Sequence, residues 1–222
     1  MSQPALSLTE LREKFQTHLV SEESLRPPEG LPTGMRAFDD FLFWKGLPKG
    51  EITLISSEPG FGGSSLWLQT VEELHKQGKW AAWINSEWQL FPTPDLRERL
   101  RWDRLLVVKN PKEAKRFFWV LQEILTSGLF DLIGCHLPQF FLKTHQLLKL
   151  KNLARLHKVS LVLVTLCRPR LHALFALIIE CGERGVLVLR AQHRAVPHRI
   201  EGAFSYARPL PAISGTTRAL VG

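Results

Sequence analysis

A glycine-rich stretch carries the most recognisable chemistry in this 222-residue chain. Residues 57–64 read SEPGFGGS and lie between an apolar run, EITLISS, and a segment with helical periodicity. A strand, a glycine turn and a helix in this order are typical of a P-loop, in which backbone N–H groups and the helix N-terminus surround a phosphate. The pattern predicts a loop of phosphate-binding type, whose candidate positions are Ser57, Gly60, Gly62, Gly63 and Ser64.

Two positions of this loop depart from the P-loop consensus, which is Gly, four residues, Gly, Lys, then Ser or Thr. Ser57 replaces the first glycine, and Gly63 occupies the lysine position. The lysine normally reaches the β- and γ-phosphates, and hydrogen bonds to charged groups contribute about 1.5–3 kcal/mol each. Glu58 adds a negative charge beside the same site. We therefore expect no nucleotide cofactor, and we assign no catalytic residue and no metal ion.

Alternating apolar and amphipathic segments must position this loop. Strands are predicted at 51–57, 80–85, 105–109, 131–137 and 159–166, and helices at 64–77, 94–101, 112–127 and 142–157. The third of these helices has an apolar stripe on one face: Phe117, Leu121, Ile124 and Leu125. Near-continuous apolar strands separated by amphipathic helices are typical of a parallel sheet buried on both faces. Two further strands, 174–180 and 185–192, have a short connection that favours an antiparallel hairpin at the sheet edge. The predicted fold class is α/β, with a mostly parallel sheet flanked by helices.

The two ends of the chain differ from this alternating core. Residues 6–20 have apolar positions at helical spacing, and the Pro27-Pro28 pair that follows interrupts any helix. We expect residues 1–30 to form an amphipathic helical arm with a Pro-rich linker. Residues 31–202 then form the core domain, and 203–222 a flexible C-terminal tail.

Charge is distributed unevenly along the chain. Residues 1–130 contain 16 Lys and Arg against 17 Asp and Glu, whereas residues 131–222 contain 13 against four, a net charge of +9. A positive field of this kind favours a polyanion or an acidic partner. A solvated basic face would have the same composition, so charge alone leaves both alternatives open.

Several classes of protein are disfavoured by composition. We find no apolar run of the ~18 residues that a membrane span needs, and no signal peptide in the first residues, so we expect a cytoplasmic protein without a membrane partner. The three cysteines are far apart and lack metal-ligand spacing, which favours buried thiols over a disulfide framework or a zinc site.

Aromatic residues divide into two groups by their position along the predicted elements. Those within or beside core elements are interpreted mostly as packing residues: Trp67, Trp80, Trp83, Trp88, Trp102 and Trp119. Trp44 and the Phe140-Phe141 pair fall in predicted turns. Because loop aromatics can dominate binding energy, these turn residues are the candidate exposed anchors for a protein interface.

Several segments resemble a known superfamily. LPTGMRAFDDFL (31–42) and GLPKGEITLISSEPGFGGSSLWLQ (46–69) resemble the entry to a RecA core, and WAAWINSE (80–87) resembles its second strand. DRLLVVKNPKEAKRFFWVLQEILTSGLFDLIGCHLP (103–138) is similar to the SulA/ImuA branch of that superfamily. The length, the arm and the basic C-terminal part resemble ImuA more than the shorter SulA. The resemblance covers about residues 31–190 and implies a RecA-like core.

The resemblance also implies roles for single residues, and most of these positions have changed. The Walker B aspartate of RecA falls on His136, and its sensing glutamine falls near Leu166. Glu87 matches the glutamate that activates water. Imidazole is a poor ligand for Mg²⁺, so the site has lost its metal anchor as well as its lysine. Glu87 is retained, but it has no bound nucleotide on which to act. We therefore predict that the chain is not an enzyme.

The DNA-binding loops of RecA correspond to two short intervals here, 138–141 and 167–173. Both are much reduced, so the resemblance does not imply filament-type DNA binding. The basic side chains that remain are candidates for a weak, nonspecific DNA contact, for an acidic-partner contact or for a solvated face. They are Lys151, Arg155, Lys158, Arg168 and Arg170.

By resemblance, the chain is an ImuA-like accessory protein in the SOS response to DNA damage. It would be a non-catalytic scaffold for error-prone translesion synthesis, with an ImuB-type polymerase-like protein and an error-prone replicative polymerase as partners. We expect the arm either to fold back on its own core or to form a small homo-oligomer. Two alternatives are a SulA-like cell-division inhibitor that binds FtsZ and an ATPase with an unconventional P-loop.

Overall fold

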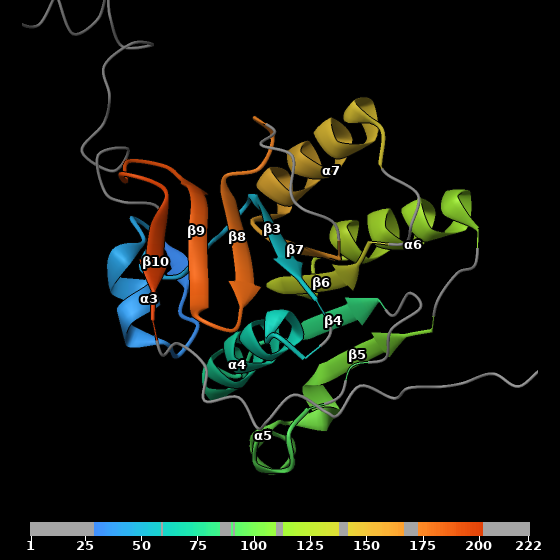
Figure 1. Ribbon diagram of the computed structural model, residues 1–222. Helices are drawn as coiled ribbons and strands as arrows, with labels where there is room; N and C mark the ends of the chain where they lie inside the picture. The colour runs from blue at the N-terminus through green and yellow to red at the C-terminus, as the bar shows by residue number, and fades with distance from the viewer. Residues whose placement is uncertain are drawn as a thin grey trace, which may run out of the picture.

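The computed structural model describes residues 29–58, 60–84, 90, 92–109, 113–137, 142–166 and 173–201 (Figure 1). The predicted helical arm and C-terminal tail lie outside these ranges, as do Glu87, Trp88, Arg168, Arg170 and the Phe140-Phe141 pair. Within them, no helix is both long and apolar enough to cross a membrane.

An eight-stranded sheet forms the centre of the molecule, in the order β10-β9-β8-β3-β7-β6-β4-β5 (Figure 1). Its strands are β3 (Ile52–Ser57), β4 (Ala81–Ile84), β5 (Leu105–Val108), β6 (Leu132–His136), β7 (Ser160–Thr165), β8 (Leu177–Gly182), β9 (Gly185–Ala191) and β10 (His198–Ile200). The strands from β8 to β5 pair in parallel, whereas β9 is antiparallel to both β8 and β10. The predicted α/β class with an antiparallel edge hairpin is confirmed.

Helices and a small two-stranded ribbon surround the sheet. The helices are α3 (Arg36–Phe41), α4 (Gly63–Lys76), α5 (Pro94–Arg99), α6 (Ala114–Thr126) and α7 (Thr144–His157), with a 3₁₀ turn at Trp102–Arg104. A separate two-stranded ribbon pairs β1 (Gly30–Leu31) with β2 (Leu47–Pro48). The long helices begin and end within a few residues of their predicted limits.

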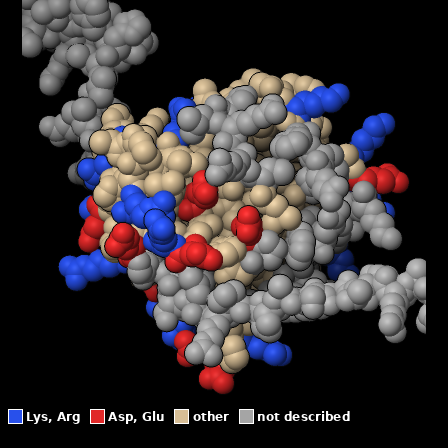
Figure 2. Space-filling view, in the orientation of Figure 1, with Lys and Arg blue, Asp and Glu red and all other residues tan. Residues whose placement is uncertain are grey.

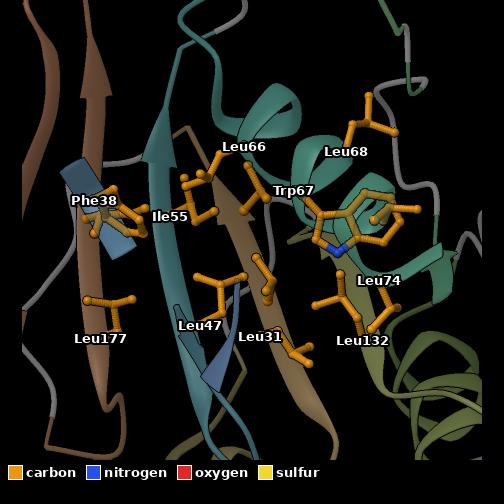
Figure 3. Close-up of a cluster of buried hydrophobic side chains, with 14 of the residues drawn as sticks. Leu31, Phe38, Leu47, Ile55, Leu66, Trp67, Leu68, Leu74, Leu132 and Leu177 are labelled. Carbon is orange, nitrogen blue, oxygen red and sulfur yellow. The ribbon is translucent and has the colours of Figure 1, made fainter. Parts of the chain in front are cut away.

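Two apolar clusters, one on each face of the sheet, hold these layers together. The first packs α4 against the sheet, and Figure 3 shows Leu66, Trp67 and Leu74 of α4 beside Ile55 and Leu132. The second lies under α6 and α7. The stripe predicted on α6 is confirmed, because its four residues, Phe117, Leu121, Ile124 and Leu125, are all buried. Near-complete burial of β3, β6 and β7 explains their continuous apolar sequences.

The interpretation of the aromatic residues was wrong for four tryptophans. Trp44 is only 3% exposed, because its turn lies against the core and its carbonyl accepts a hydrogen bond from the Gly30 N–H at 2.9 Å. Trp80, Trp102 and Trp119 are instead 44%, 46% and 58% exposed. These three tryptophans lie at the ends or on the outer faces of helices and strands. Predicting a helix or strand does not predict whether a side chain at such a position is buried. Trp44 is therefore not an exposed anchor.

The sheet edge also differs from prediction. Strand β10 adds to β9, so the predicted hairpin is not the outermost pair. Only Ile200 of its three residues is buried, which leaves no periodicity for sequence analysis to detect.

Candidate functional site

The glycine loop leaves the carboxyl end of β3 and leads directly into α4. All six residues of β3 are buried, which fixes the start of the loop. Gly62 precedes the helix with φ of 89°, a left-handed conformation that favours glycine. The strand, turn and helix expected of a P-loop are therefore in place.

The hydroxyl of Ser57 occupies the interior of this loop. Its Oγ accepts a hydrogen bond from the Gly63 N–H at 3.1 Å and donates one to the Glu58 carbonyl at 3.0 Å. The N–H groups of the first helical turn have no partner within the helix and are the groups that bind phosphate in a P-loop. Here a side chain of the loop itself already binds one of them.

The same side chain limits which residue position 63 can hold. A Cβ added to Gly63 would lie 2.6 Å from the Ser57 Cβ and 3.0 Å from its Oγ. Real Cβ atoms do not approach this closely, so a lysine at position 63 requires Ser57 or the backbone to move. The two departures from the P-loop consensus are thus sterically coupled.

His136 lies at the end of β6, on the strand that the resemblance assigns to the metal-binding aspartate. It is 8% exposed, its Nε2 is 3.4 Å from the Ser64 Oγ, and its ring stands edge-on to Trp83. Burial lowers the pKa of His136 to about 4, so the ring is neutral near pH 7. A neutral imidazole therefore lies where the resemblance places the carboxylate that would anchor Mg²⁺, and it is within hydrogen-bond distance of the Ser64 hydroxyl.

Behind the loop, two tryptophans that the sequence predicts as packing residues form an aromatic pair, and their predicted burial is confirmed. The rings of Trp67 on α4 and Trp83 on β4 lie 4.6 Å apart, and both are fully buried. A Cβ at Gly134 would come within 2.4 Å of Trp67 Nε1 and 2.5 Å of the Trp83 ring. The sequence signal for this packing was Gly134 within the apolar run of β6, because a glycine inside a strand often marks a place where another group packs closely against the backbone.

The surroundings of the loop are acidic. A cavity of about 250 Å³ beside it is lined by Ser57, Leu166 and three glutamates, Glu58, Glu180 and Glu183. Its described lining contains no Lys or Arg. Three carboxylates would repel a triphosphate at this position. Nowhere in the described ranges, this cavity included, is a group of three or more His, Cys, Asp or Glu placed to hold a metal ion.

The predicted basic patch lies at the other end of the sheet. Glu51, just before β3, pairs with Lys151 at 3.2 Å and with the Arg155 Nε at 2.9 Å. Lys158 ends α7 with φ of 54°. The structure therefore brings Lys151 and Arg155 together around a carboxylate, while Arg168 and Arg170 lie outside the described residues.

Comparison with known proteins finds RecA. The chain is 31% identical to the RecA protein of Thermotoga petrophila over 116 residues, which are 52% of this chain and 32% of that protein. It is 31% identical to RecA of Thioalkalivibrio sulfidiphilus over 110 residues, with 50% and 32% covered. For RecA of Marinobacter nauticus the identity is 28% over 130 residues, with 57% and 37% covered. The chain thus spans about a third of the length of these relatives, and no family model matches it.

Proposed function

Because the chain is related to RecA over about half of its length, we propose that it is a RecA-derived protein that acts by binding and does not hydrolyse ATP. The observation that carries this proposal is the contact between Ser57 and Gly63. The Ser57 hydroxyl accepts a hydrogen bond from an N–H of the kind that binds phosphate, and the Ser57 side chain also leaves no room for the P-loop lysine at position 63.

Two features of the loop reduce the free energy of binding a triphosphate there. Releasing the Ser57 hydrogen bond costs about 0.5–1.5 kcal/mol, and the missing lysine removes about 1.5–3 kcal/mol. Together these losses of about 2–4.5 kcal/mol weaken triphosphate binding by roughly 30- to 2,000-fold. Glu58 opposes binding further, and His136 offers no carboxylate for Mg²⁺. A phosphate-release assay with Mg·ATP, with and without DNA, is expected to stay at the level of the buffer. Release above that level would favour the alternative of an ATPase with an unconventional P-loop.

We further propose a scaffolding role in DNA repair, of the kind that ImuA-like proteins have in error-prone translesion synthesis. The partners would be an ImuB-type polymerase-like protein and an error-prone replicative polymerase, in the cytoplasm of a DNA-damaged bacterium. Support comes from the segment 103–138 and from the outer strand β5. Among the described residues no strand pairs with the outer edge of β5, and its Leu106 and Val107 are each 40% exposed. An edge strand with apolar side chains suits protein docking.

A pull-down tests the role and its main rival together. The full chain is offered an ImuB-type protein, the polymerase and FtsZ in parallel. Two substitutions on β5, Leu106→Ser and Val107→Ser, are expected to reduce capture of the ImuB-type protein at least tenfold. The matched control is Leu129→Ser with Leu156→Ser, since these leucines are 67% and 74% exposed elsewhere. Capture of FtsZ alone would favour the SulA-like alternative, and equal capture by both variants would exclude β5 as the docking site.

A further inference from the structure

The turn between β9 and β10 carries a second basic surface, distinct from the predicted patch on α7. The ten residues 190–199 include five basic or imidazole side chains: Arg190, His193, Arg194, His198 and Arg199. No Asp or Glu occurs between Glu183 and Glu201, and residues 192–199 are all exposed. We propose that this turn binds the phosphate backbone of a nucleic acid.

Strand pairing places the turn far from the glycine loop. Ala191, the last residue of β9, pairs with Leu177 at the start of β8, and Leu177 also pairs with Thr53 near the start of β3. The turn therefore lies at the amino edge of the parallel strands. The glycine loop and the glutamates beside it lie at the carboxyl edge. Figure 1 shows the β8–β9 and β9–β10 turns at opposite ends of strand β9.

The cations of this turn are not paired within the described part of the chain. No ion pair there includes Arg190, Arg194 or Arg199, whereas Lys151 and Arg155 both pair with Glu51. The face seen in Figure 2 has acidic and basic side chains close together near its middle, with no continuous basic patch. An unpaired guanidinium can form two parallel hydrogen bonds to a phosphate, so the turn is better suited to phosphate than the α7 patch.

Aromatic contacts hold the turn in position. His198 stacks on Phe41 with ring centroids 4.0 Å apart and planes 8° apart. The guanidinium of Arg194 lies 6.0 Å from the centre of the same Phe41 ring, and His193 contacts Phe43 at 4.7 Å. Side chains ordered before binding lose less conformational entropy when a ligand arrives. The segment from α3 to Phe43 therefore preorganises the basic turn.

The distribution of cations over both faces favours a nucleic acid over an acidic protein. His198 pairs with Val188, which belongs to the cluster under α4, so His198 and Phe41 share that face. Successive strand residues point to opposite faces, so Arg199, paired with Leu187, lies on the other face. Arg190 pairs with Ile178 of the second cluster and lies on that face too. A two-stranded ribbon with cations on both faces fits between two rows of phosphates in a groove.

The test measures the binding of fluorescent duplex and single-stranded DNA by anisotropy at several salt concentrations. In the double variant Arg194→Glu/Arg199→Glu, affinity is expected to fall at least tenfold. The slope of log affinity against log salt should decrease by about 2. The control, Arg97→Glu/Arg116→Glu, has the same charge change on exposed arginines of α5 and α6. It should stay within twofold of the unsubstituted chain, and circular dichroism should show all three proteins folded.

Three results would overturn the proposal. One is equal affinity of the turn variant and the control. Another is a larger loss of DNA affinity in Lys158→Glu than in the turn variant, which would place the DNA contact at the end of α7. The third is the absence of DNA binding at about 50 mM salt, together with binding of a polyglutamate peptide that requires Arg194 and Arg199. That result would assign the turn to an acidic protein. None of these results depends on ATP or on the docking edge β5.

Discussion

The glycine loop and the β9–β10 turn differ in how their polar groups are partnered. In the loop, the Gly63 N–H bonds Ser57, and Ser64 bonds a neutral His136. Three glutamates line the adjacent cavity. In the turn, residues 192–199 are exposed and three arginines form no ion pair with other described residues. The polar groups of the loop already have internal partners, whereas solvent reaches those of the turn, and this difference is why we propose a ligand for the turn and none for the loop.

The largest expected effect lies behind the loop, at Gly134. Substitution Gly134→Ala places a methyl group within 2.4 Å of Trp67 and 2.5 Å of Trp83, and neither buried ring has room to move. We expect the free energy of unfolding to fall by about 3 kcal/mol. The control is Gly182→Ala, another strand glycine, where a Cβ meets nothing within 4 Å. It should change stability by less than about 0.5 kcal/mol. Urea unfolding measures both, and equal midpoints would show that the aromatic packing is loose.

The pH dependence of stability tests the neutral state of His136. Its pKa is lowered to about 4 in the folded chain, against about 6.5 when unfolded. As pH falls through this interval, the unfolded chain binds a proton that the folded chain does not, so stability decreases by about 1.4 kcal/mol per pH unit. Between about pH 7 and pH 4.5, the unsubstituted chain should lose roughly 2–3 kcal/mol more than His136→Asn. Parallel stability curves would show that His136 is solvated or already protonated.

The energetic coupling between Ser57 and Gly63 is expected to be smaller than the effects at Gly134 and His136. Gly63→Ala should destabilise the chain by about 1–2 kcal/mol because of the 2.6 Å approach to Ser57. In the Ser57→Gly background the same change should cost at least about 1 kcal/mol less. A double-mutant cycle in urea gives this coupling energy. Additive effects would mean that the two replacements are independent.

The smallest effect is expected in the turn. Arg194→Ala removes an exposed guanidinium that lies over Phe41, so stability should change by less than about 0.5 kcal/mol. Thermal unfolding checks this value. A loss of several degrees in melting temperature would show that Arg194 mainly supports the fold, and would weaken its assignment as a phosphate contact.

Sequence analysis predicted what depends on local pattern. Apolar runs located β3, β6 and β7, and the stripe on α6 was correct in every residue. Contacts between distant residues were not predictable from pattern. The pairing of Arg155 with Glu51 joins residues 104 apart in the chain, and it changes the meaning of the α7 patch. The contact of Ser57 with Gly63 depends on backbone geometry within the turn, and the burial of Trp44 depends on a two-stranded ribbon too short to recognise.

Calorimetric titration with Mg·ATP tests the central claim, that the loop is closed to phosphate. The unsubstituted chain should show no saturable binding at physiological, millimolar nucleotide. The triple variant Ser57→Gly/Gly63→Lys/His136→Asp restores the two P-loop positions and the carboxylate, and it should bind more tightly than the unsubstituted chain. Saturable micromolar binding by the unsubstituted chain, abolished by Gly62→Trp within the loop, would contradict the account.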